Sequence, residues 1–101
     1  MIKYSSWRVF TMPKIVRKND KNNKGGAALK GDSTFIVNNQ PAVRNGSPVS
    51  KHPKGTPHRS AKTAGGSKSF ILSNIKANYV GNSDSCGHSR SGGSPDFFIG
   101  N

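Results

Sequence analysis

The side chains best able to bind a metal are three histidines and one cysteine. His52 and His58 lie in one stretch that is poor in apolar residues, and Cys86 and His88 lie in another. Three imidazoles and one thiolate can complete a tetrahedral shell around zinc, with iron(II) as the second choice. The i, i+2 spacing of Cys86 and His88 puts both side chains on one side of an extended backbone. The turn-rich residues 53–57 could hold the other two imidazoles facing inward.

A second interpretation fits these residues equally well, with the histidines solvated in loops beside an ordinary thiol. Spacing alone does not decide, because the sequence has no CxxC pair and no known finger pattern. Leu, Ile, Val and Phe make up only 19 of the 101 residues, which is few for a folded domain. A chain with so small a core gains from a metal whose binding energy is also folding energy. This need favours one zinc ion per chain.

Nucleophilic catalysis is a further alternative for Cys86. A thiol nucleophile would need a base such as His88, an orienting group such as Asp84, and a pocket. Nothing in the sequence builds the pocket, and four protein ligands would leave a metal no open position for water. We therefore expect no enzymatic activity.

The chain is strongly basic, with 16 Lys and Arg against 4 acidic residues and a formal net charge of +12. Such a charge attracts anionic surfaces. In a nucleic-acid-binding small β protein, Phe35 and Phe70 would stack on bases while Lys and Arg contact phosphates. The charges are spread along the chain, however, and both aromatics belong to apolar clusters. Nucleic-acid binding is therefore the second hypothesis.

The segments that must position these loops repeat along the chain. Residues 31–47 return as 66–82, with Gly, Phe, Ile, an aliphatic residue, Asn, Ala and Gly in register, and 93–101 is a shortened third copy. Repetition at this spacing predicts a fold built from copies of one small unit, none of which buries its apolar face alone. The three copies predict an all-β body of short hairpins with pseudo-threefold symmetry.

Each full copy predicts a β-hairpin. The first copy has strands near 34–38 and 42–44, and the second near 69–72 and 76–80. The turns fall at Asn38-Asn39 and at Ser73-Asn74, where the residues tolerate positive φ.

Other parts of the chain carry weaker signals. The third copy offers only an outgoing strand at 96–99, and residues 13–17 could form a first strand. The long stretches 47–66 and 82–93 predict loops without secondary structure.

The chain divides into a short extension and one domain. Residues 1–11 have an apolar character of their own, and Met12-Pro13 looks like a fresh start. We therefore expect 1–11 to be an extension from an upstream start or a separate docking segment, and 12–101 to be a single domain. The first residues lack the continuous apolar run of a signal peptide. We therefore expect synthesis in the host cytoplasm and no export by the general secretory route.

Residues 12–101 resemble the PAAR-repeat proteins. The resemblance rests on Met12-Pro13, on Pro41-Ala42-Val43-Arg44 followed by Asn45-Gly46, on the echo Lys76-Ala77-Asn78-Tyr79-Val80-Gly81, and on the closing Phe97-Phe98-Ile99-Gly100. The signature tetrapeptide Pro-Ala-Ala-Arg is present once, as Pro-Ala-Val-Arg. In the second copy it has changed to Lys-Ala-Asn-Tyr.

The resemblance implies a small cone that caps and sharpens a trimeric β-helical spike, one chain per trimer. Such tips belong to the baseplates of contractile phage tails and to type VI secretion machines, and they touch the host outer envelope briefly as they pierce it. The short chain looks most like the tip protein of a phage virion.

The family also implies a metal-stabilised apex, which fits His52, His58, Cys86 and His88. Members often carry a histidine before the first glycine pair, where this chain has Lys24. One ligand must therefore come from elsewhere, and His58 or His88 is the substitute.

The apolar clusters of the three copies would supply the contact with the spike. The residues expected at this interface are Phe35, Ile36, Val37, Phe70, Ile71, Leu72, Phe97, Phe98 and Ile99.

Overall fold

The computed structural model describes residues 13–50 and 61–100. Its strands are β1 (Asp32–Val37), β2 (Gln40–Ala42), β3 (Ile71–Leu72) and β4 (Ile75–Lys76), paired antiparallel as β1–β2 and β3–β4. These residues form no helix, and so none that is long and apolar enough to cross a membrane. The all-β prediction is confirmed at this level for the described part of the chain. The predicted extension 1–11 lies outside it.

Both hairpins turn where the sequence predicts. Asn38 and Asn39 have φ values of 51° and 68°, and Ser73 and Asn74 have 50° and 69°. Positive φ at both central residues is the mark of a type I′ turn, whose twist matches that of the flanking strands. The second hairpin is shorter than predicted, since β3 and β4 have only two residues each. In the first hairpin, β1 begins two residues earlier than predicted, and β2 keeps the predicted length but ends at Ala42.

The predicted strands at 96–99 and 13–17 are not formed as strands, but the two segments are paired with each other through an isolated bridge. Phe98 pairs antiparallel with Lys14. The Ile15 N–H donates to the Phe97 carbonyl at 3.0 Å, and the Ile99 N–H donates to the Pro13 carbonyl at 2.9 Å. Residues 13–15 therefore supply the pairing partner of residues 97–99.

Backbone hydrogen bonds join the three return segments in a closed ring. The Val16 N–H donates to Asn78 O at 3.0 Å, the Asn78 N–H to Val43 O at 2.8 Å, and the Val43 N–H to Val16 O at 2.8 Å. Val16, Val43 and Asn78 occupy the same position in the three return segments. A second ring repeats the relation, with donation from Lys18 to Pro41, from Asn45 to Lys76 and from Val80 to Lys14. The three segments are thus related by an approximate threefold rotation. We call each return segment, together with the residues that follow it up to the next copy, a unit; the first unit contains Arg17, the second Arg44 and the third Tyr79.

The described parts of the stretches 47–66 and 82–93 contain no helix or strand, as expected for loops, but they are paired. Isolated antiparallel bridges join Pro48 to Lys62, Thr63 to Asp84, and Ser83 to Ser89. The bridge from Thr63 to Asp84 connects two different units. The paired segments show no alternation of apolar and polar residues, which is the signal that predicts a strand, so the sequence does not predict these pairings.

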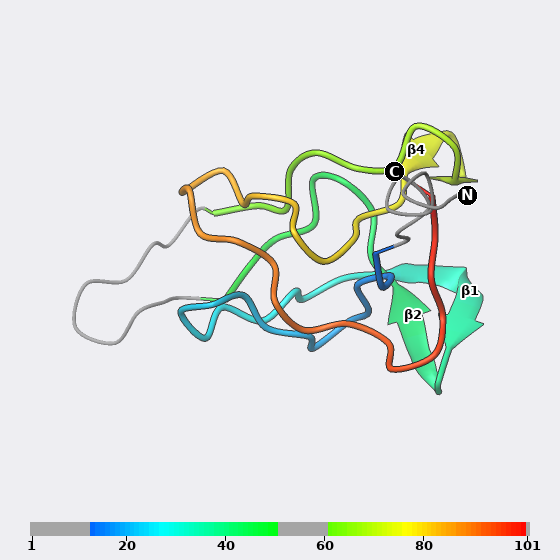
Figure 1. Cartoon of the computed structure of the whole chain (residues 1–101), viewed down its shortest axis with the longest axis horizontal. Coiled ribbons are helices and arrows are strands. Elements are labelled where there is room, and N and C mark those ends of the chain that lie inside the picture. Colours follow the sequence, from blue (N-terminus) through cyan, green and yellow to red (C-terminus); the bar gives the residue numbers. More distant parts are fainter. Residues whose placement is uncertain (1–12, 51–60, 101) are drawn as a thin grey trace, which may run out of the picture.

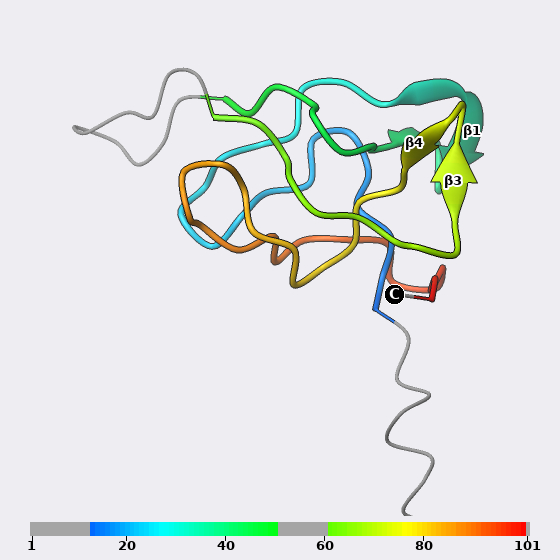
Figure 2. The same cartoon turned by 90° about the horizontal axis from the view of Figure 1, so that it is seen from above.

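The molecule has two distinct ends, which we call the base and the tip. The base carries both hairpins and residues 97–99, whereas the tip carries the turns at 22–26 and 84–88 and the flanking residues Ser50 and Ala61. Figure 1 shows the hairpins at one end and the turns near 22–26 (light blue) and 84–88 (orange) at the other, and Figure 2 shows the same separation.

The apolar core lies mainly at the base. The third residue of each Phe-containing triplet is buried there, together with one apolar residue at the equivalent position of each return segment. The members of this cluster are Ile15, Val37, Ala42, Leu72, Ala77 and Ile99.

Candidate functional site

Three phenylalanines meet at the base. The ring centroids of Phe35 and Phe70 are 5.4 Å apart, those of Phe35 and Phe97 are 5.6 Å apart, and those of Phe70 and Phe97 are 6.1 Å apart. These near-equal distances form a triangle, and the spacing is that of favourable aromatic pairs. All three rings are partly buried against the core cluster. The predicted repeats therefore bring their equivalent aromatic residues together.

A side-chain cap precedes each of these phenylalanines. Asp32 accepts a hydrogen bond from the Thr34 N–H at 2.9 Å. In the same way, Ser67 Oγ accepts a hydrogen bond from the Ser69 N–H at 3.1 Å, and Ser94 Oγ accepts one from the Asp96 N–H at 3.2 Å. Short polar side chains bind nearby backbone N–H groups in this way and fix the entry of a strand.

The caps also link one repeat to the next. Ser73 donates to Asp32 Oδ2 at 2.8 Å, and Ser94 donates to Asn38 Oδ1 at 2.6 Å. Ser67 donates to the carbonyl of Gly100. Each bond joins the cap of one copy to the turn position of another, so these three bonds form a further closed ring at the base.

Two carboxyl groups of the base are held in their charged form. Hydrogen bonds from the Thr34 hydroxyl, the Thr34 N–H and Ser73 lower the pKa of Asp32. Hydrogen bonds from Asn38 and Ser94 lower the pKa of Asp96. Both effects arise because the donors stabilise the carboxylate more than the neutral acid.

Exposure alternates along each predicted interface triplet. The middle residues Ile36, Ile71 and Phe98 are 53%, 49% and 46% exposed. The preceding phenylalanines are partly buried, and the following residues, Val37, Leu72 and Ile99, are buried in the core. Large apolar side chains are therefore left in solvent at three equivalent positions.

The tip contains a polar cluster that the sequence did not predict. Arg90 and Asp84 are fully buried and form an ion pair of 2.9 Å between Nη2 and Oδ2. The same Oδ2 accepts a hydrogen bond from Asn22 at 2.7 Å. The only sequence signal is positional, since Arg90 occupies the place held by Ala28 and Thr63 in the other units, as the backbone bonds from Asn19, Gly46 and Gly81 show.

Two of the four predicted metal ligands lie together at the tip. Cys86 Sγ and His88 Nδ1 are 3.6 Å apart. Both side chains are partly exposed, and Gly87 between them has a φ of 95°. His52 and His58 lie outside the described residues. Within residues 13–50 and 61–100, no group of three or more His, Cys, Asp or Glu could hold a metal ion.

The residues that flank the segment 51–60 lie beside this pair. The Ser85 N–H donates to the Lys62 carbonyl at 2.8 Å, and the Lys62 N–H donates to Ser85 Oγ at 2.9 Å. The Val49 N–H donates to the Ala61 carbonyl at 2.9 Å, so the two flanks are hydrogen-bonded to each other. Both flanks are therefore at the tip, close to Cys86.

The Cys86–His88 distance fits a shared tetrahedral zinc. With Zn–S and Zn–N bonds of ordinary length at the tetrahedral angle, the sulfur and nitrogen would lie roughly 3.6 Å apart. A thiol–imidazole hydrogen bond has a similar length, so the distance is compatible with a metal but does not require one.

Comparisons with known proteins do not assign this chain to a family. The chain matches no model of a known protein family, and no curated protein is significantly similar to it.

Proposed function

We propose that this chain is a structural tip protein that caps the end of a trimeric β-helical spike in a contractile phage tail. The observation that carries the proposal is the exposure of Ile36, Ile71 and Phe98 at equivalent positions around the base. Exposed apolar groups gathered in this way are typical of protein-binding surfaces. The proposed role is mechanical, without catalysis, in the baseplate of the virion and in brief contact with the host envelope.

The symmetry of the base supports a trimeric partner. A trimer presents the same surface three times around its axis. One chain that repeats its contact residues in a closed ring can meet all three subunits in nearly the same way, and its outer strands can extend their sheets by strand addition. The expected stoichiometry is one chain per spike trimer.

A binding experiment with a trimeric β-helical spike fragment tests this proposal. We expect a complex of one chain with one trimer, measured by native mass spectrometry. Ile36→Glu and Phe98→Glu should each weaken binding by at least about tenfold, because each places a charge in the contact. Leu29→Glu is the matched control, since Leu29 is an exposed apolar residue outside the hairpins.

The same variants separate this function from nucleic-acid binding. The spike complex should persist at high salt because its contact is apolar. Tight binding to DNA that falls steeply with salt, unchanged by Ile36→Glu, would instead support the nucleic-acid hypothesis. Spike binding that all three glutamate variants weaken equally would contradict the assignment of the base.

We also propose a zinc site at the tip formed by His52, His58, Cys86 and His88, with iron(II) as the second choice. The Cys86–His88 distance and the position of the flanks of 51–60 support it. A closed set of four protein ligands would make the ion structural, and its binding energy would add to the stability of the tip.

Metal analysis of the purified full-length chain tests this site. We expect one zinc per chain, a lower melting temperature after chelation, and loss of both effects in Cys86→Ser. Lys24→Ala, in the turn of the first unit, should keep the metal and the chelator response. Substoichiometric metal in the native chain, or full metal content in Cys86→Ser, would refute the proposed ligand set.

A further inference from the structure

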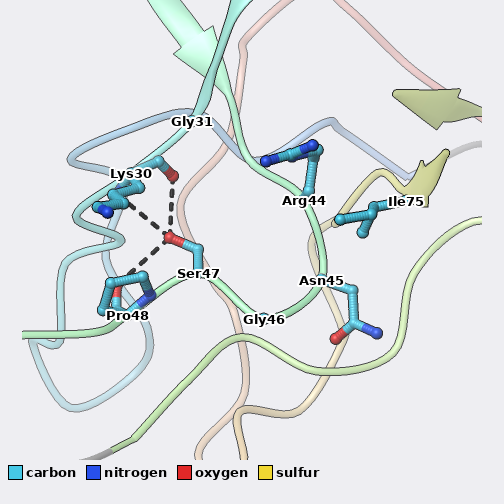
Figure 3. Close-up of a pocket in the computed structure, with 8 residues that line it drawn as sticks. All are labelled: Lys30, Gly31, Arg44, Asn45, Gly46, Ser47, Pro48 and Ile75. Carbon is cyan, nitrogen blue, oxygen red and sulfur yellow. Dashed lines mark hydrogen bonds between the residues drawn. The ribbon is translucent and has the colours of Figure 1, made fainter. Parts of the chain in front are cut away.

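A basic pocket lies between Lys30–Gly31 and residues 44–48 of the second unit, beside the β3–β4 hairpin. Lys30 and Arg44 supply its two positive charges, and Figure 3 shows the Arg44 side chain extending toward the Lys30–Gly31 segment. No acidic residue lines the pocket. Its remaining lining residues are Gly31, Asn45, Gly46, Ser47, Pro48 and Ile75.

The first unit shows what an arginine at this position can bind. Arg17 is equivalent to Arg44, since Arg17 bridges to Ala42 as Arg44 bridges to Ala77. Its Nε and Nη2 each donate to the Asp20 carboxylate at 3.0 Å. Asp20 lies three residues after Arg17, so the first unit supplies its own two-point acceptor. This two-point geometry is the strong form of an arginine–carboxylate contact.

The second unit lacks that carboxylate. Ser47 lies three residues after Arg44, and its hydroxyl donates to the Lys30 carbonyl at 2.9 Å instead (Figure 3). The ion pairs among the described residues involve Arg17 and Arg90, and neither Arg44 nor Lys30 takes part in one. The third unit has Tyr79 at the equivalent position, so it places no cation there.

The nearest internal carboxylate is already engaged. The charge of Arg44 contributes to the lowered pKa of Asp32, but hydrogen bonds from Thr34 and Ser73 make larger contributions. Asp32 is buried and both of its oxygens accept those bonds. It therefore does not supply Arg44 with the two-point contact that Asp20 gives Arg17.

We infer that the pocket formed by Lys30 and Arg44 binds a carboxylate from an acidic side chain of the protein that docks on the base. The inference rests on the proposed function. Ile75 lines the pocket and pairs with Leu72, next to Ile71 of the base. A partner seated on the base thus reaches the rim of the pocket. Because a symmetric trimer offers the same acid three times, one copy meets Arg44 in each of the three possible placements.

The first test needs no spike. The full chain is labelled with ¹⁵N, and the arginine Nε signals are followed during titration with glutarate, with inorganic phosphate and with sodium chloride at equal ionic strength. The Arg44 signal should shift toward saturation with glutarate while that of Arg17, already bound to Asp20, stays. An absent Arg44 shift, an equal shift of both arginines, or a larger response to phosphate would overturn the carboxylate assignment.

The second test uses the spike fragment with Arg44→Gln. Loss of a charge-assisted contact should weaken binding by about tenfold, and Lys62→Gln, which removes an exposed charge at the tip, should leave it unchanged. Melting curves should match the parent for both variants, because the side chain of Arg44 holds no structural bond in the described chain. Normal spike binding by Arg44→Gln, together with loss in Ile36→Glu, would refute the pocket but keep the proposed function. If no variant or parent binds the spike, the proposed function fails and the glutarate titration still decides whether the pocket takes a carboxylate.

Discussion

The base and the tip have the same approximate threefold arrangement of the backbone, but they differ in the side chains at equivalent positions. At the base, equivalent positions hold similar apolar residues, such as the three phenylalanines whose rings meet. At the tip, equivalent positions hold unlike residues, including the buried Asp84 and Arg90. The backbone rings nevertheless continue there, since Asn23, Ser50 and Ser85 each accept a hydrogen bond from the backbone of another unit.

This difference shows what the threefold arrangement requires. Apolar packing around an axis is best when the facing residues match in shape, so the base repeats its sequence. Polar groups are satisfied one at a time by specific donors and acceptors, and three identical charges would repel one another. The tip therefore keeps the backbone symmetry and gives up the symmetry of the side chains.

The largest effect should follow from breaking the polar cluster of the tip. Arg90→Met leaves Asp84 buried without its ion-pair partner, which should lower the free energy of unfolding by about 3–5 kcal/mol, measured by urea denaturation. Adding Asp84→Asn should restore part of that loss, since the amide oxygen still accepts the hydrogen bond from Asn22. A double variant no more stable than Arg90→Met would show that lost packing, and not the stranded charge, is the cause.

The next effect should separate the two faces of a base strand. Leu72→Ala removes a buried side chain of the core and should cost about 2–5 kcal/mol of unfolding free energy. Ile71→Ala, one residue earlier and about half exposed, should cost about 0.5 kcal/mol or less. Both are measured by urea denaturation of the unbound chain. Equal losses would mean that Ile71 is covered in the unbound protein, contrary to its proposed role in binding.

The smallest effect should be the dependence of stability on acid. Asp32 has a lower pKa when folded than when unfolded, so it stabilises the protein at neutral pH, and this contribution is lost as the pH falls through its folded pKa. Asp32→Ser introduces the residue found at the two equivalent caps and should flatten the loss of stability as the pH falls below the ordinary pKa of an aspartate, 3.8. Melting temperatures across this range measure it.

A second variant keeps the carboxylate but weakens its stabilisation. Thr34→Val removes the hydroxyl that contributes most to the lowered pKa of Asp32. It should flatten the acid dependence less than Asp32→Ser does. An acid profile that neither variant changes would assign the loss of stability to other carboxylates, such as Asp96.

The sequence predicted the parts of the fold that depend on local chemistry. The two turns were found because Asn and Ser-Asn pairs tolerate positive φ, and the apolar positions at the base were found because each follows the same glycine-to-phenylalanine pattern. The pairing of Phe98 with Lys14 was not predicted, because residues 13–17 contain neither the glycine nor the phenylalanine that marks the copies. The Arg90–Asp84 pair was missed because nothing nearby in the sequence marks a buried charge.

The same distinction applies to the candidate site: its local features could be predicted from the sequence, and those that depend on the fold could not. Alternation along a strand follows from backbone geometry, so the sequence could have separated Ile36 from Val37. Arg17 has a carboxylate partner because Asp20 follows it by three residues, whereas Ser47 stands at that place after Arg44. The sequence does not show that the two arginines are equivalent; that relation comes from their equivalent backbone bridges. The metal ligands stay a prediction, because His52 and His58 lie outside the described residues.

The pairing of residues 13–15 with 97–99 has a consequence for the order of folding. The two segments lie far apart in the sequence, so the threefold body cannot close until residues 97–99 have been synthesised. A polypeptide that stops before these residues would keep one side open and display only two of the three hydrophobic contacts. Closure of the ring thereby makes a complete base depend on the segment that follows Gly93.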